Sequence, residues 1–311
     1  VEAGGTFDGG SGIHTIGSIE SNTATSTLIM TSGNCTINGS GGGNQLEIST
    51  SSTFTHSSGT IILTYAHHLE VNTHALYNLI INQSGDTHLD AALTIANDLT
   101  ITSGNFETDD DGGPCYNLTV SGNVDITTKL DCKDSITIDL NGDVTIGSGA
   151  ELKATTGSLN WSGSTWTNAG TFAHNNGTVI LDGTNQAIVG SNTWCHFTKS
   201  VSSAASLTID NTSTQTFLKN VTLNGVSEQL LSILSDSAGN AFDFVMYPAS
   251  VKTKLEYLSV KDSDASGSAP VYKPIEPTNS VDVSGNIDWF SAGVSVTINQ
   301  GVVISNYYYG N

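Results

Sequence analysis

The densest group of side chains with potential chemistry is a run of carboxylates, Glu107 and Asp109–Asp111, followed by two glycines. Clustered carboxylate oxygens suit a hard cation, so Asp109, Asp110 and Asp111 are the candidate ligands for Ca²⁺, the one cofactor that the sequence suggests. A paired acid and base for glycosidic-bond cleavage is a second hypothesis, and a solvated turn is a third. The glycine-rich nonapeptide of calcium-loaded β-rolls and the EF-hand spacing are both absent.

Two cysteines form a candidate disulfide or stacked pair, Cys115 and Cys132. They lie three residues before Leu118 and four before Ile136, so a stack of coils would place them on adjacent coils. Strands in a sheet lie about 4.8 Å apart, which is close to the Cα separation across a disulfide. No Cys-x-x-Cys motif accompanies them, which argues against a zinc or redox site of that type.

Three tryptophans, Trp161, Trp166 and Trp194, could stack against sugar rings if they lie on an exposed face. Burial at the corners of the coils is the alternative. Of the eight histidines, His67, His68 and His74 could bind a transition metal, but no acidic residue stands at metalloprotease spacing beside them. We therefore expect a structural role for the histidines.

The charge balance excludes several functions. The chain has 29 acidic residues and 9 basic ones, all of them lysine. Nucleic-acid binding requires a basic surface, so we expect no nucleic-acid partner. No run of 18 apolar residues exists, so we expect no membrane insertion. Pectate-lyase-type chemistry is disfavoured because those enzymes use arginine, and the chain contains none.

Short apolar-polar-apolar triplets recur in the middle of the chain and alternate as strands with one buried face do. Leu99, Leu118 and Ile136 form one series at spacings of 19 and 18, and Val124 and Val144 form another at 20. This spacing predicts an all-β, elongated parallel β-helix (β-solenoid) with coils of about 18–20 residues. A pair of β-sandwiches is the alternative, although sandwich strands should not recur with a common step. Residues 228–236 could form two helical turns, but their place in the repeat predicts a strand.

The sequence also repeats over a longer range. Residues 53–63 match residues 171–181 at an offset of 118, which places His56 and His174 at equivalent positions. We expect an N-terminal β segment or cap at 1–49, solenoid modules at 50–170 and 171–290, and a tail at 291–311. The tail would cap the stack or pair with another chain.

Several phrases of the chain resemble those of a known group of proteins. The phrases are Asn97–Asn105, Tyr116–Asp125, Leu130–Cys132, Phe172–Thr178, Leu258–Ser263 and Gly285–Phe290. They resemble the repeat-rich fibre and surface proteins of tailed phages and bacterial adhesin-like proteins. The resemblance implies a right-handed parallel β-helix on the outside of a virion or a cell.

We therefore expect a non-enzymatic structural component of an extracellular fibre, spike or decoration on a phage virion, with weak adhesion to host glycans. Its expected partners are other virion or surface proteins, further copies of this chain in a homo-oligomer, and a host-surface glycan. A secreted bacterial surface adhesin of the same fold is the alternative. A polysaccharide-degrading β-helix enzyme is the third hypothesis.

Overall fold

The computed structural model describes residues 1, 4–21, 25–40, 44–65, 67–134 and 137–291. These residues form an all-β parallel solenoid of about 12 turns, which confirms the predicted fold class. Their one helical element is a single 3-10 turn, η1 (Pro270–Tyr272). In the described ranges, no helix has the length and apolar character needed to cross a bilayer. The predicted tail lies outside the described residues except for Ser291.

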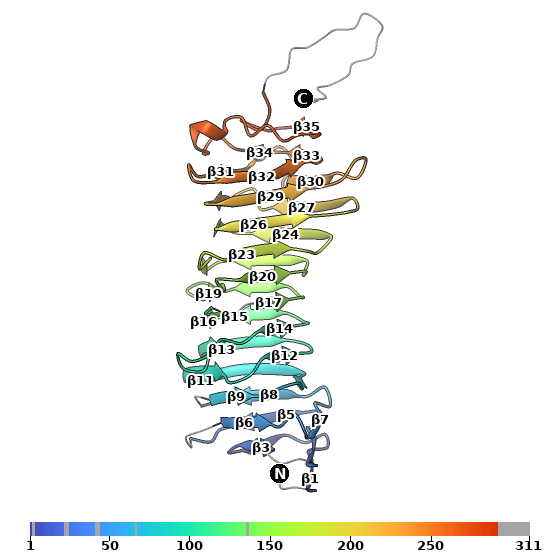
Figure 1. Ribbon diagram of the computed structural model, residues 1–311, viewed down its shortest axis with the longest axis vertical. Helices are drawn as coiled ribbons and strands as arrows, with labels where there is room; N and C mark the ends of the chain where they lie inside the picture. The colour runs from blue at the N-terminus through green and yellow to red at the C-terminus, as the bar shows by residue number, and fades with distance from the viewer. Residues whose placement is uncertain (2–3, 22–24, 41–43, 66, 135–136, 292–311) are drawn as a thin grey trace, which may run out of the picture. The chain divides into compact units, whose positions relative to one another are not determined.

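The chain divides into two compact units, each a stack of parallel strands (Figure 1). Unit 1 comprises Val1–Gly163 and Ala169–Gly177, and unit 2 comprises Ser164–Asn168 and the described residues from Thr178 onward. The strands of unit 1 are β1 (Thr6–Asp8), β2 (His14–Ile16), β3 (Ile19–Ser21), β4 (Thr27–Ile29), β5 (Asn34–Ile37), β6 (Asn44–Ile48), β7 (Thr53–Thr55), β8 (Thr60–Leu63), β9 (His67–Glu70), β10 (Ala75–Leu76), β11 (Asn78–Leu89), β12 (Leu93–Ile95), β13 (Leu99–Glu107), β14 (Leu118–Val120), β15 (Val124–Ile126), β16 (Lys129–Asp131), β17 (Thr137–Leu140), β18 (Val144–Ile146), β19 (Glu151–Lys153), β20 (Ser158–Trp161) and β22 (Thr171–Ala173). The strands of unit 2 are β21 (Thr165–Asn168), β23 (Thr178–Leu181), β24 (Asn185–Val189), β25 (Asn192–Trp194), β26 (His196–Ser200), β27 (Ala205–Ile209), β28 (Thr214–Phe217), β29 (Asn220–Asn224), β30 (Leu231–Ser235), β31 (Phe242–Met246), β32 (Val251–Glu256), β33 (Leu258–Lys261), β34 (Ser263–Asp264) and β35 (Val281–Ser284).

The strands of each unit pair in long parallel ladders. In unit 1, one ladder runs β10-β12-β14-β17-β20, and another runs β9-β11-β13-β16-β19-β22. In unit 2, three ladders run β23-β26-β29-β32, β21-β24-β27-β30-β33-β35 and β25-β28-β31-β34. Residues 231–235 belong to the second of these as strand β30, so the predicted strand is confirmed over the helical alternative.

The triplets form strands because their two apolar residues point into the core while the middle residue points outward. In β14 and β15 the first and third residues are buried, and the middle residue is Thr119 or Asp125. Each fully buried Leu, Ile or Val contributes about 1.5–3 kcal/mol. One coil carries too few such side chains to offset its conformational entropy, so the coils are stable only as a stack.

The predicted spacing of the coils is only partly correct. Val144 pairs with Val124 as predicted, but Leu99 also pairs with Val124 and not with Leu118. Leu118 instead lies between Leu93 and Ile138. The reason is that β13 continues to Glu107 and a loop precedes β14, which lengthens this coil to 25 residues from Leu99 to Val124. Ile136, the third member of the predicted series, lies outside the described residues.

The long-range repeat corresponds to one kind of turn, which occurs twice in unit 1. In both copies the histidine Nδ1 accepts a hydrogen bond from a backbone N–H two residues later, between His56 and Ser58 at 3.0 Å and between His174 and Asn176 at 2.9 Å. The two residues after each histidine have positive φ angles between 45° and 61°. The equivalence of His56 and His174 is therefore confirmed as a shared local conformation.

The glycine that ends each of these turns lies against the backbone of the preceding coil. A Cβ atom at Gly59 would lie 1.9 Å from the carbonyl oxygen of Thr31, and one at Gly177 would lie 2.0 Å from that of Thr155. Both distances are far below van der Waals contact. The turn therefore requires glycine because the coils stack closely at this corner.

We expect Gly59→Ala to lower the free energy of unfolding by about 3 kcal/mol, because the added methyl group pushes neighbouring coils apart. Gly17→Ala is the matched control, since a Cβ there has no atom within 4 Å and the residue does not have a positive φ. Urea denaturation of both variants measures the difference. Equal midpoints for the two variants would contradict the close approach.

A lysine is buried in the core of unit 2. Lys199 of β26 is 0% exposed, and its Nζ donates hydrogen bonds to the carbonyl oxygen of Gly183 at 2.7 Å and to Gln186 Oε1 at 2.6 Å. Burial lowers the pKa of Lys199 from 10.5 to about 8, and the carboxylate of Asp182 opposes this shift. Below about pH 8 the charged form of Lys199 lowers the free energy of unfolding, and this effect disappears as the pH rises to about 10.5.

Lys199→Met removes this titration. Between about pH 8 and about pH 10.5, the unfolding free energy of the wild-type protein is expected to rise relative to that of the variant. The expected relative rise is on the order of 3 kcal/mol. Denaturation at the two pH values measures it, and parallel pH profiles for the two proteins would show that Lys199 has an ordinary pKa.

Candidate metal centre

A column of charged side chains runs along one ladder of unit 1. Register pairs His68 with His88, His88 with Glu107, Glu107 with Asp131, and Asp131 with Lys153. In-register parallel strands place such residues at successive heights on the same face, about 4.8 Å apart. The solenoid therefore brings together ionisable groups that are about 20 residues apart in the sequence.

Three side chains of this region converge on one point, namely His88, Glu107 and Asp109. His88 Nδ1 lies 3.8 Å from Glu107 Oε2 and 3.8 Å from Asp109 Oδ1. His88 and Asp109 are buried, with exposed fractions of 9% and 5%. Neither His88 Nδ1 nor Asp109 Oδ1 makes a hydrogen bond. The three donor atoms could together hold a metal ion.

The loop after β13 positions Asp109. Asp109 forms an isolated antiparallel bridge with Cys115, so the loop folds back on itself. The backbone N–H of Gly112 donates a hydrogen bond to Asp109 Oδ2 at 3.1 Å. One carboxylate oxygen is thus held by the loop, and the other, Oδ1, is directed toward His88.

A second, more exposed group lies beside the first. His68 Nδ1 lies 2.9 Å from Asp90 Oδ1 and 3.7 Å from Asp110 Oδ1. The rings of His68 and His88 are in contact, with centroids 5.2 Å apart. His68 Nδ1 already has a close carboxylate partner in Asp90, whereas His88 Nδ1 is buried and makes no hydrogen bond.

Lysines from the following coil neutralise the buried carboxylates. Lys133 Nζ lies 2.7 Å from Glu107 Oε2 and 3.7 Å from Asp109 Oδ1. Burial alone would lower the pKa of Lys133, but the hydrogen bond with Glu107 and the charges of Glu107, Asp109 and Asp131 raise it overall. The ammonium group therefore remains charged beside these oxygens.

Asp131, the next residue of the column, is held by three lysines. Its carboxylate lies 3.3 Å from Lys129 Nζ and 3.2 Å from Lys153 Nζ, and it accepts a 3.0 Å hydrogen bond from the backbone N–H of Lys133. Burial by itself would raise the pKa of Asp131. The hydrogen bond from Lys133 and the charges of Lys153 and Lys129 outweigh this effect and lower the pKa.

We expect Asp131→Asn to destabilise unit 1 by about 3 kcal/mol near neutral pH, because it leaves three lysines beside a buried neutral group. Since the folded pKa of Asp131 is lowered, its contribution is present above the unfolded value and is lost as the pH falls through the folded value. The difference in unfolding free energy between Asp131→Asn and the wild-type protein should therefore shrink below about pH 3.8. Asp125→Asn, on the exposed side of β15, is the control. If the unfolding free energy of Asp131→Asn differed from that of the wild-type protein by the same amount at every pH, the ion pairing of Asp131 with the lysines would be contradicted.

The structure separates the three residues predicted to bind Ca²⁺. Asp109 belongs with His88 and Asp110 with His68, while the side chain of Asp111 is 81% exposed. The three aspartates do not converge on one point, because successive residues of the loop point into different surroundings. His88 and Glu107, which do converge, are 19 positions apart, which is close to the coil spacing that the triplets indicated.

The predicted pairing of Cys115 and Cys132 is wrong. Both cysteines are free, and the register of Glu107 with Asp131 places Cys132 beside Thr108. Cys115 lies in the folded-back loop, which is an insertion relative to a coil of 18–20 residues. Burial raises the pKa of the Cys132 thiol far above its usual value, so this cysteine is unreactive.

The three tryptophans predicted to bind sugars are buried, each with 1% exposure or less. Trp161 in unit 1 donates a hydrogen bond to the carbonyl oxygen of Gly142 at 3.0 Å. In unit 2, Trp166 and Trp194 begin a series of aromatic contacts, with ring centroids 5.8 Å apart. Each tryptophan occupies a position of its strand that points into the core, so no ring face is exposed to stack on a sugar.

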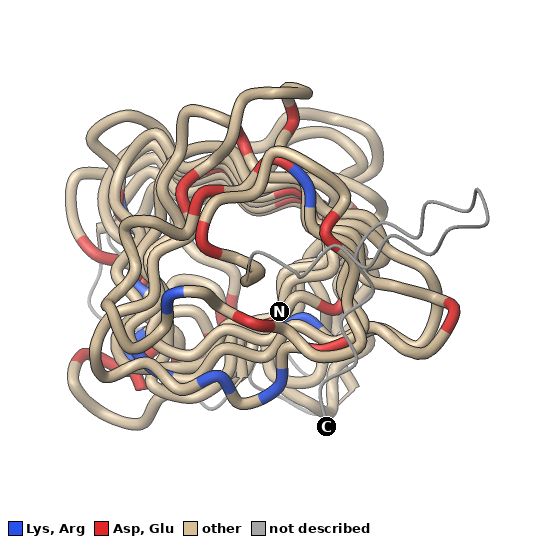
Figure 2. The backbone as a smooth tube through the Cα atoms, turned by 90° about the horizontal axis from the view of Figure 1, so that it is seen from above, with Lys and Arg blue, Asp and Glu red and all other residues tan. Residues whose placement is uncertain are grey.

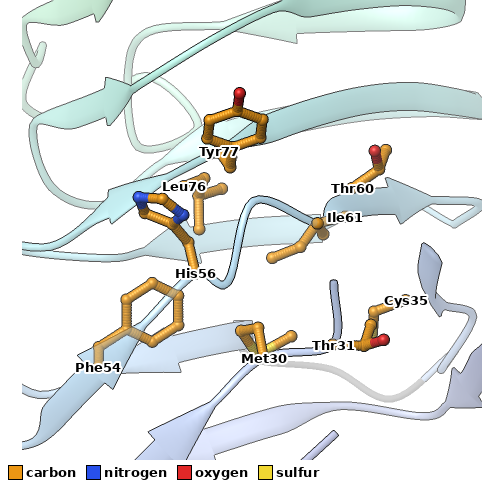
Figure 3. A pocket seen from close by; sticks show the side chains of 10 residues that line it. Met30, Thr31, Cys35, Phe54, His56, Thr60, Ile61, Leu76 and Tyr77 are labelled. Carbon is orange, nitrogen blue, oxygen red and sulfur yellow. The ribbon is translucent and has the colours of Figure 1, made fainter. Parts of the chain in front are cut away.

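Unit 1 also has a small pocket, shown in Figure 3, where Phe54, His56 and Tyr77 lie along one side. The rings of His56 and Tyr77 stack with centroids 5.2 Å apart. The pocket has a volume of about 10 Å³, which is room for about one water molecule. It is therefore too small for a sugar ring.

Comparison of the chain with protein-family models, with curated proteins and with solved structures found no match. The function is therefore inferred from the fold and its side chains.

Proposed function

We propose that this chain is a non-enzymatic structural component of an extracellular fibre, spike or decoration on a phage virion. The observation that carries the proposal is the filled interior of each unit, in which one coil packs its apolar residues directly on those of the next. Leu93, Leu118 and Ile138 are examples, each with an exposed fraction of 2% or less. Such a stack suits a rigid supporting element, because each coil is held by its neighbours on both sides.

The charge of the chain agrees with exposure to solvent. Asp and Glu greatly outnumber Lys along the backbone (Figure 2), and the formal net charge is −20. Parallel strands expose unpaired edges at the ends of a stack, and these edges can pair with other chains. A strong net charge of one sign keeps a strand-rich surface protein soluble.

The buried acids support a structural role over catalysis. The side chains of Glu107 and Asp109 are 12% and 6% exposed, and Lys133 lies against both. A glycosidase needs its acid and base to reach the bond on opposite sides of a sugar, which these two side chains cannot do. Glycan adhesion stays a prediction, now without the three tryptophans.

Immunogold electron microscopy tests the proposal, with antibodies raised against recombinant protein spanning residues 1–291. We expect the gold label on phage particles, at fibres, spikes or the capsid surface. Label confined to the outer surface of bacterial cells would replace the proposal by the adhesin alternative. Label confined to the cell interior would contradict both.

A further inference from the structure

We infer that His88, Glu107 and Asp109 form a binding site for a divalent transition-metal ion of the zinc class, and that Lys133 occupies the same carboxylates when the metal is absent. This site is independent of the phage assignment. It would tie the end of β11 and the end of β13 to the loop that follows β13.

Two buried donor atoms at this site make no hydrogen bond, His88 Nδ1 and Asp109 Oδ1. A buried polar atom without a partner typically costs about 1–3 kcal/mol. These two atoms lie 3.8 Å apart, and Glu107 Oε2 is also 3.8 Å from His88 Nδ1. Ligands held tetrahedrally by zinc at about 2.1 Å lie about 3.4 Å apart. Small side-chain rotations therefore suffice to bind one ion.

The types of donor atom indicate the type of metal. Ca²⁺ takes six to eight oxygen ligands, whereas an imidazole nitrogen favours zinc, copper, nickel or iron. One imidazole and two carboxylates supply three ligands of the nitrogen and oxygen types that zinc takes, and a tetrahedral ion would have a fourth position for water. The donors of this site therefore favour the zinc class over the Ca²⁺ that the aspartate run suggested.

Asp111 lies on the other side of the His88 ring. Asp111 Oδ1 lies 4.0 Å from His88 Nε2, the ring nitrogen opposite the proposed metal-binding atom. No hydrogen bond joins the two atoms at this distance. The Asp111 side chain is 81% exposed, and a rotation that let it accept a hydrogen bond from Nε2 would orient a metal-bound histidine.

Lys133 would compete with the metal ion for the carboxylates of Glu107 and Asp109. Its Nζ lies 2.7 Å from Glu107 Oε2 and 3.7 Å from Asp109 Oδ1, so one positive charge already faces both ligands. It also lies 4.0 Å from Asp131 Oδ2, and its side chain is 26% exposed. Metal binding would thus move the ammonium toward Asp131 or into solvent, and no change of the backbone is required.

The test is isothermal titration of metal-free, tag-free protein with Zn²⁺, repeated with Co²⁺ to record the absorption bands of a tetrahedral site. We expect one Zn²⁺ per chain in the wild-type protein. His88→Gln should weaken binding by at least about 100-fold, and Lys133→Gln should tighten it by about 10-fold because the competing charge is gone. Circular dichroism confirms that each variant is folded.

Two histidine variants serve as controls. His68→Gln alters the adjacent group and His174→Gln alters a turn of unit 1, so both should bind Zn²⁺ as the wild-type protein does. The inference is overturned if neither the wild-type protein nor Lys133→Gln binds Zn²⁺, or if His88→Gln binds it unchanged. Loss of binding in His68→Gln with binding kept in His88→Gln would place the metal at His68, Asp90 and Asp110 instead. Equal affinity of Lys133→Gln and the wild-type protein would refute the competition.

Discussion

The hydrogen-bonded register between neighbouring coils is the constraint on which the other features of each unit depend. Because the strands are parallel and pair in register apart from a few local shifts, a paired side chain lies over its partner in the coil before it. Leu118, for example, is fixed between Leu93 and Ile138. A slip of one residue would turn every apolar side chain outward. The same close stacking explains why Gly59 has no room for a Cβ atom.

This register also decides which charges meet. Glu20, Glu47 and Glu70 form a column of like charges in unit 1. Burial and then the charges of Glu70 and Glu20 raise the pKa of Glu47, so the column is unfavourable at neutral pH. The column that contains Glu107 and Asp131 is different, because lysines of the next coils face its carboxylates. Its buried charges are therefore stabilised, and His88 is left as the group whose ring nitrogen has no hydrogen-bonded partner.

The fold could be predicted because alternation within a triplet depends only on neighbouring residues, and the step from Val124 to Val144 gives one coil correctly. The pairing of Leu99 with Val124 could not be predicted, because it depends on the number of residues in the loop after Glu107. The predicted pairing of Cys115 with Cys132 failed for the same reason, because Cys115 lies in this loop. Glu107 and Asp109 stand out in the sequence as part of a carboxylate run, but His88 does not, because it is 19 residues from Glu107. Only the coil spacing connects His68, His88 and Glu107.

Cross-linking of engineered cysteine pairs tests the register most directly. Thr94 and Thr119 are paired on β12 and β14 and are not fully buried, whereas Thr100 pairs with Asp125. Partners at about 4.8 Å are within disulfide range. After mild oxidation, peptide mass spectrometry should find a disulfide in Thr94→Cys/Thr119→Cys and none in Thr100→Cys/Thr119→Cys. A bond in the second pair and none in the first would show that the coils stack in another register and would contradict the account of unit 1.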